Sequence, residues 1–236
     1  MWLATFPRRW LCQRAALNIV PTRWLETVLG LPRTAVVAHG VAECGAGLEA
    51  KTALQSKFCF VGRLVSTKGV DTLLAAAKQL KAKGHRFQLH VIGEGPERAR
   101  LEASAKRGGL NGTVEFLGAV KQERIEQELA ESLAVVVPSR AGEVFGLVAA
   151  ESMMAGRAVV TSDIGALQEV SGETGLRFPA GNAEALAKHM ESLLETPGLA
   201  ARLGEQARVR AEELYSMDRM VREHLRLNEE TASQEN

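Results

Sequence analysis

Short apolar runs rich in β-branched residues recur between Phe58 and Phe178, and a stretch of mixed polar and apolar residues follows most of them. The runs are almost continuously apolar rather than alternating, which is typical of parallel strands that helices cover on both faces. We expect strands at residues 58–62, 87–93, 113–118, 134–139, 158–162 and 175–178.

The stretches between these runs place apolar residues at helical spacing. In residues 69–84, one helical face would carry Val70, Leu73, Leu74, Ala77 and Leu80, and Gly84 favours a helix end. The other helices expected on this basis are 96–109, which begins with a proline suited to a first helical turn, 122–132 and 183–195. This alternation predicts an α/β fold with a doubly wound parallel sheet from residue 58 to about residue 195.

The sequence on either side of this region is organised differently. Before it, the pattern predicts a helix near 9–15, a strand at 16–20, a turn or helix from Pro21, a strand at 34–41 and an unpatterned linker at 42–57. After it, residues 200–230 read as helices and 231–236 as a frayed end. We therefore divide the chain into residues 1–50, which are too few to bury a core alone, a main domain at 51–215, and a C-terminal helix with a frayed tail at 216–236.

Composition and charge narrow the class of protein. The 236 residues are 46% hydrophobic and 24% charged, and the net charge is +1, so no overall field favours nucleic acid or an anionic membrane. No apolar run approaches the roughly 20 residues that span a bilayer. Arginines interrupt the first twenty residues, which lack the features of a signal peptide. We expect a cytoplasmic protein without a transmembrane segment, and peripheral contact with the inner membrane surface stays open.

Residues that commonly bind metals are scattered. The three cysteines form no C-x-x-C pair and are interpreted as buried or incidental thiols: Cys12, Cys44 and Cys59. The five histidines show no metal-ligand spacing. The three aspartates are isolated, so no D-x-D pair exists to hold a divalent cation against a diphosphate. The sequence thus predicts no metal ion and no cofactor.

Loops that follow the predicted strands are the candidate ligand sites, because ligands of open parallel sheets bind beyond the carboxyl ends of the strands. Arg63 and Lys68 follow the first strand. A guanidinium can hold a phosphate through two hydrogen bonds, and an ammonium acts as a mobile point charge, so the pair suits a diphosphate. The alternative is a solvated loop with two surface cations.

Nucleotide motifs of other classes are incomplete or absent. Gly93 and Gly95 begin a G-x-G-x-x-G pattern, but Arg98 occupies the third glycine position and the loop is not in the first βα turn. The match to a dinucleotide fingerprint is therefore weak. A phosphate-binding G-x-x-x-x-G-K-[ST] loop does not occur in the sequence.

The stretch GEVFGLVAAESMMAG, residues 142–156, predicts a helix that begins near 145–147 and ends at Gly156. Its first N–H groups, at the positive end of the helix dipole, suit an anion. Helical spacing places Glu151 on the face that carries Leu147 and Met154. A buried carboxylate costs several kcal/mol or becomes protonated unless it has a partner, so we expect either a protein donor or ligand hydroxyls beside it. Glu143 would overhang the same crevice.

Several ordered segments together resemble the donor-binding domain of retaining GT-B glycosyltransferases of the family 4 or group 1 type. They are FVGRLVSTKGVDTLLAA, VIGEGPE, VEFLGAV, VVVPSRAGEVFGLVAAESMMAGRAVV, SDIGALQEV and TGLRFPAGNAEALA. The resemblance covers roughly residues 58–215, and the Glu-x7-Glu element with its Phe-Gly pair is fairly specific. Residues 17–41 are similar to the last strand and helix of the family's acceptor domain and the interdomain strand, so residues 1–50 are interpreted as a remnant of that side.

The resemblance implies roles for individual positions. Arg63 and Lys68 match the basic pair that binds the diphosphate, and Glu143 the glutamate near the donor sugar, so these three would serve catalysis. Glu151 matches the glutamate that accepts hydrogen bonds from the ribose. The whole donor-binding set is then Gly62, Arg63, Lys68, Glu143, Phe145, Gly146, Leu147 and Glu151.

Two motifs depart from the family pattern. Residues 38–41 read Ala-His-Gly-Val where the family has Pro-Asn-Gly-Val. Residues 165–169 read Gly-Ala-Leu-Gln-Glu where the family has a double glycine followed by Pro-Glu.

The resemblance implies a glycosyltransferase that moves a sugar, with retention and without a metal ion, from a UDP, GDP or ADP sugar to a saccharide, lipid or small-molecule acceptor. The acceptor domain would be separate or missing. The alternative is a non-catalytic module that binds nucleotide sugars or a partner protein.

Overall fold

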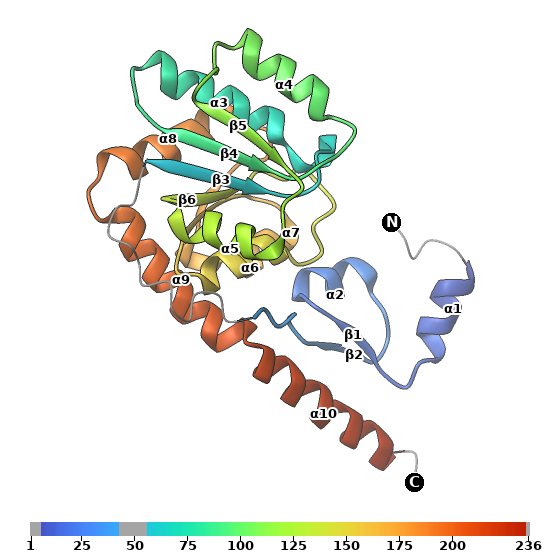
Figure 1. Ribbon diagram of the computed structural model, residues 1–236. Coiled ribbons are helices and arrows are strands. Elements are labelled where there is room, and N and C mark those ends of the chain that lie inside the picture. Colours follow the sequence, from blue (N-terminus) through green and yellow to red (C-terminus); the bar gives the residue numbers. More distant parts are fainter. Residues whose placement is uncertain (1–5, 43–55, 235–236) are drawn as a thin grey trace.

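A parallel α/β sheet with helices on both faces dominates the computed structural model, which describes residues 6–42 and 56–234 (Figure 1). Most of the predicted linker at 42–57, and Cys44, lie outside these residues. The six strands are β3 (Lys57–Val61), β4 (Gln88–Ile92), β5 (Val114–Gly118), β6 (Ala134–Val137), β7 (Ala158–Ser162) and β8 (Leu176–Phe178). All pair in parallel, in the order β5-β4-β3-β6-β7-β8, so the predicted fold class is confirmed.

The helices expected between the strands form close to their predicted positions: α3 (Val70–Ala82), α4 (Arg98–Arg107), α5 (Gln122–Glu131), α6 (Leu147–Met154) and α8 (Ala183–Glu195). Helix α4 begins two residues after Pro96, where a turn precedes it. Three short elements were not predicted: a 3₁₀ turn η1 (Ser66–Lys68), α7 (Gly165–Ser171) and a 3₁₀ turn η2 (Gly172–Thr174). They are too short for a hydrophobic periodicity to develop.

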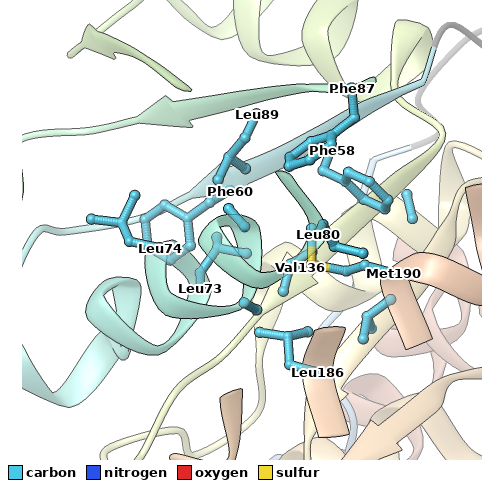
Figure 2. Packing of buried hydrophobic residues seen from close by; sticks show 14 of the residues in the cluster. Phe58, Phe60, Leu73, Leu74, Leu80, Phe87, Leu89, Val136, Leu186 and Met190 are labelled. Carbon is cyan, nitrogen blue, oxygen red and sulfur yellow. The ribbon is translucent and has the colours of Figure 1, made fainter. Parts of the chain in front are cut away.

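Alternate residues of each strand supply two different cores, because successive side chains of a strand point to opposite faces. Phe58 and Phe60 of β3 pack with α3, α4 and α8 on one face, and Figure 2 shows this cluster with Leu73, Leu80 and Met190. The alternate residues point to the other face. There Cys59 and Val135 pack with α5, and Val137 and Val159 pack with α6, α7 and α9 (Leu199–Tyr215). Burial on both faces explains why the strands read as continuous apolar runs.

The strand order fixes where a ligand can bind. Counted from β3, the six strands follow the order 3-2-1-4-5-6, in which successive strands are added on one side of β3 up to β5 and on its other side from β6 onward. The connections after these two strands leave toward opposite sides, and a crevice opens between them at the carboxyl ends. Both loops that the sequence singled out, after β3 and after β6, meet at this point.

The segment before the sheet, residues 6–42, is here called the N-terminal segment. It contains α1 (Phe6–Arg14), β1 (Asn18–Val20), α2 (Arg23–Leu29) and β2 (Thr34–Val36), with β1 and β2 parallel to each other. The predicted strand at 34–41 is shorter than expected because its partner ends at Val20, before Pro21. Beyond it, Val41 pairs with Ser216 and donates a hydrogen bond to Tyr215 O (2.8 Å), which ties the segment to the C-terminal helices.

The C-terminal helices extend further than predicted. Helix α10 (Met217–Gln234) follows α9 and reaches away from the sheet, on the side of the N-terminal segment (Figure 1). The prediction that the chain frays from residue 231 was wrong for residues 231–234, which continue the helix. The hydroxyls of Thr231 and Ser233 donate hydrogen bonds to carbonyls one turn earlier and so fit within it. No helix in residues 6–42 or 56–234 has both the length and the apolar content to cross a bilayer.

Candidate functional site

A cleft of about 370 Å³ lies at the carboxyl ends of β3 and β6. All of the predicted donor-binding residues except Glu151 line it: Gly62, Arg63, Lys68, Glu143, Phe145, Gly146 and Leu147. They come from the loop after β3, the loop after β6 and the start of α6. The topology thus brings together residues that are far apart in the sequence.

Lys68 and Arg63 differ in their surroundings. Lys68 ends η1 and forms an ion pair with Glu143 across the cleft, with its side chain 28% exposed. The next residue must be glycine, because Gly69 has φ +67° and an added Cβ would lie 2.0 Å from Pro138 O. Arg63 is exposed, and its guanidinium makes no hydrogen bond or ion pair with any residue the structure describes. Lys68 is therefore not the solvated surface cation of the alternative interpretation, and Arg63 is free to meet an anion.

Glu143 is held on the cleft side of the β6 loop. Its side chain is 11% exposed, and its Oε1 accepts hydrogen bonds from the Ser139 hydroxyl (2.7 Å) and from Lys68. Ser139 is itself fully buried and lies two residues after the end of β6. The carboxylate therefore has a fixed position and overhangs the crevice as predicted.

The amino end of α6 opens onto the cleft. Gly146 is its N-cap with φ +98°, and an added Cβ would come within 2.5 Å of the Leu167 side chain. The first hydrogen bonds of the helix run from Ala149 and Ala150 to Gly146 O, at 2.9 and 3.2 Å. The N–H groups of Leu147 and Val148 precede them and have no acceptor among the described residues. Free N–H groups at the positive end of a helix dipole suit an anionic ligand.

Glu151 lies one helical turn beyond Leu147, outside the lining of the cleft. The apolar stripe expected around it is split, because Met154 is buried while Leu147 is 48% exposed. The Glu151 carboxylate is partly buried and has no hydrogen bond or ion pair with the side chains that the structure describes, those of residues 9–42 and 56–233. Burial, and then the charge of Glu126, raises its pKa above the ordinary value. Of the two partners expected from the sequence, the protein donor is thus not found in the described chain.

Two further residues, His39 and Ser139, belong to the site and were not predicted. His39 lines the cleft, and its ring meets Phe145 edge-on at a centroid distance of 5.1 Å. Burial, and then the nearby His224, lowers the pKa of His39. The departure from Pro-Asn-Gly-Val marked this position, whereas nothing in the sequence distinguishes Ser139.

One group of described residues could hold a metal ion. Ligand atoms of His85, Glu191 and Glu195 lie within 4.8 Å of one another. His85 precedes β4, so this group lies at the amino ends of the strands, opposite the cleft. Glu191 already forms an ion pair with Lys83, whose Nζ lies 2.7 Å from Glu191 Oε2. The group has no part in the cleft chemistry.

Comparisons with known proteins identify a family for this chain. Residues 50–210, more than half of the chain, match the family of glycosyl transferases group 1. The chain is 31% identical over 191 residues to an exopolysaccharide phosphotransferase of Streptomyces coelicolor, covering 78% of this chain and 20% of that protein. It is 33% identical over 150 residues to the alpha-D-kanosaminyltransferase of Streptomyces kanamyceticus, covering 63% and 39% respectively. The chain therefore spans well under half the length of these relatives.

Solved structures show the same fold. The sucrose-phosphate synthase of Thermosynechococcus elongatus superposes with a TM-score of 0.82 at 28% identity, over 96% of this chain and 61% of that one. The HepE protein of Anabaena, solved with UDP and glucose, gives a TM-score of 0.82 at 23% identity over 96% and 66%. Because residues 50–210 match the family model and the six-stranded sheet superposes on the solved structures, the chain belongs to the glycosyl transferases group 1 family and has a GT-B Rossmann-like domain.

Proposed function

We propose that this chain supplies the donor-binding half of a retaining glycosyltransferase that uses a nucleotide-diphosphate sugar without a metal ion. The observation that carries the proposal is the cleft between β3 and β6, where Lys68, Arg63 and the amino end of α6 converge opposite Glu143. An acceptor-side domain, on a longer chain or a separate one, would form the other wall and bind a saccharide, lipid or small-molecule acceptor.

The positive groups of the cleft would bind the diphosphate and stabilise it as it leaves. Lys68 and Arg63 provide two cations, and the free N–H groups of Leu147 and Val148 add hydrogen-bond donors that cost no reorganisation. As the bond between sugar and diphosphate breaks, negative charge grows on the phosphate oxygens and positive charge on the sugar. Groups placed in advance at the growing negative charge lower the barrier without a metal ion.

The two glutamates would read the rest of the donor. The carboxylate of Glu143 overhangs the cleft and is held in place by Ser139 and Lys68, which suits it to accept hydrogen bonds from sugar hydroxyls. Glu151 lies one turn into α6, partly buried and without a donor among the described residues, and a pair of ribose hydroxyls would satisfy it. The HepE relative was solved with UDP-glucose, which supports a nucleotide sugar as the donor class.

Calorimetry with UDP, GDP, ADP, UDP-glucose, GDP-mannose and ADP-glucose tests the proposal. We expect one nucleotide series to bind, equally well with and without EDTA. Lys68→Met and Glu151→Ala should each weaken binding roughly 10- to 150-fold, because each removes hydrogen bonds to or from a charged group. Lys83→Met, which changes an exposed lysine at the opposite edge of the sheet, should leave affinity unchanged.

No binding by any of the six ligands, or equal binding by Lys68→Met and the wild type, would contradict the proposal. Transfer is tested separately, by adding an acceptor-side domain and following the anomeric configuration of the product by proton NMR. Binding without transfer or donor hydrolysis would instead favour the non-catalytic module.

A further inference from the structure

The amino end of α2 contacts the loop that carries Glu143. Thr22 caps α2: its hydroxyl accepts a hydrogen bond from Leu25 N (3.2 Å) and donates one to Val144 O (3.1 Å). Thr22 is 1% exposed, so both bonds are shielded from water. Val144 lies between Glu143 and Phe145 in the chain. One hydroxyl therefore joins a helix of the N-terminal segment to the backbone beside the candidate sugar-binding carboxylate.

Glu169 of α7 makes a second connection to the same helix end. Its two carboxylate oxygens accept hydrogen bonds from Arg23 N and Trp24 N, each at 3.0 Å. These are the first N–H groups of α2, which favour a negative charge. The Trp24 indole lies directly over Gly165, where an added Cβ would come within 2.5 Å of the ring. The helix is thus fixed to α7 by polar bonds and by close packing.

The contact matters most when a ligand is bound. In the free protein Glu143 is held from three directions, by Lys68, by Ser139 and through the backbone at Val144. A diphosphate that binds Lys68 removes the first of these. The orientation of the carboxylate then depends on Ser139 and on the bond from Thr22.

We propose that Thr22 and Glu169 are positioning residues that hold the Glu143 loop for sugar recognition, so that the N-terminal segment sets how well the site distinguishes a nucleotide sugar from its nucleoside diphosphate. This inference rests on the proposed function for the nature of the ligand. It assigns to Glu169 a function at the start of helix α2, whose N–H groups at Arg23 and Trp24 are 146 and 145 residues away in the sequence. A diphosphate displaces Lys68 from Glu143 whether or not it carries a sugar, so changing either residue should cost additional affinity only for the sugar nucleotide.

The experiment measures, for each variant, the ratio of the dissociation constants of the sugar nucleotide and the matching nucleoside diphosphate among the six ligands above. Thr22→Val keeps the shape of the side chain but loses both hydrogen bonds, and should shift this ratio against the sugar nucleotide roughly 3- to 10-fold. Thr22→Ser keeps the hydroxyl and should restore the wild-type ratio. Thr27→Val is the matched control, because the exposed Thr27 hydroxyl bonds only within α2, to Arg23 O (3.0 Å).

A general loss of stability would change the fraction of folded protein but not the ratio of two affinities of the folded state, so the ratio isolates positioning. If Thr22→Val does not fold, Glu169→Ala gives the same test, since it removes both acceptors from α2. A wild-type chain that binds none of the ligands overturns the proposed function and this inference together. A wild-type chain that binds, with unchanged ratios in Thr22→Val or Glu169→Ala, overturns this inference alone.

Discussion

Lys57 is the most deeply buried lysine of the sheet region, and its replacement by methionine should destabilise the protein strongly. The residue begins β3 and is 2% exposed. Its Nζ lies 3.0 Å from Glu128 Oε2 and 2.9 Å from Glu131 Oε2, both on α5. Glu128 is fully buried and also bonds to His90 Nδ1 at 2.7 Å. Lys57→Met would leave the Glu128 carboxylate in the interior without its ammonium partner.

The magnitude follows from this geometry. Removal of one partner of a buried ion pair costs about 3–5 kcal/mol, because the remaining charge stays desolvated. His90 and Arg124 stay beside Glu128, so we expect about 3 kcal/mol. For a chain of this size that is a fall in Tm of roughly 6–12 °C.

Acidity should weaken the same cluster. Burial raises the pKa of Glu128, but hydrogen bonds from His90 and Lys57 outweigh it and hold the pKa below its ordinary value. A lowered carboxyl pKa contributes stability that is present above the unfolded value of about 4.3 and is lost as the pH falls through the folded value. Wild-type stability should therefore drop on acidification below about pH 4.3, and Lys57→Met should show less of this drop.

Thermal and urea unfolding measure these effects, with Lys83→Met as the matched control. Lys83 also pairs with a glutamate, at 2.7 Å, but it is 53% exposed, so its loss should cost less than about 1 kcal/mol. Lys57→Met combined with Glu128→Leu should recover part of the loss, since no buried charge is left unpaired. Equal destabilisation by Lys57→Met and Lys83→Met would refute the reasoning.

Two further substitutions test the candidate site through stability. Glu151→Gln should raise the Tm of the free protein at pH 7, because burial raises the pKa of Glu151 and its charged form is therefore unfavourable. The Tm of the wild type should approach that of the variant as the pH falls toward 4, where the carboxyl is protonated. A lower Tm of the variant at pH 7 would count against an unpartnered carboxylate. Gly146→Ala should cost about 1–3 kcal/mol more in urea unfolding than Gly84→Ala, because both positions have positive φ but only an added Cβ at position 146 meets a side chain within 4 Å; equal costs would show that the clash is relieved.

The sequence indicated the sheet well because a strand that is buried on both faces is recognisable from a run of only a few consecutive residues. Burial on both faces forces strands such as 134–137 to be apolar throughout, and β-branched residues then separate them from helices. Helix α7 escaped notice because its seven residues begin with a glycine and form only two turns. Its position depends on packing against Trp24 and α2, which the local sequence does not encode.

The candidate site was predictable where topology alone decides, and not where side chains meet across the fold. Arg63, Lys68 and Glu143 could be placed at one edge because the carboxyl ends of parallel strands meet there. That Lys68 pairs with Glu143 depends on the turn at Gly69 and on the Ser139 hydroxyl, and neither has a sequence signal. The bond from Thr22 to Val144 joins residues 122 positions apart, and only the packing of α2 creates it.

The pairing of Lys68 with Glu143 gives the free cleft a partly neutral character that its residue types do not suggest. Under the proposed function, a diphosphate would compete with Glu143 for Lys68, so part of the attraction to the anion would be offset by the loss of an existing ion pair. Loss of the lysine would leave Oε1 of Glu143 with the Ser139 hydroxyl as its remaining donor, so that it could accept a further hydrogen bond from a sugar. Oε2 of Glu143 accepts no hydrogen bond from the described residues, so one oxygen of the carboxylate is open to a sugar even while Lys68 is paired. The free N–H groups of α6 and the unpaired Arg63, which compete with no protein partner in the described chain, would then be the groups that first attract the ligand.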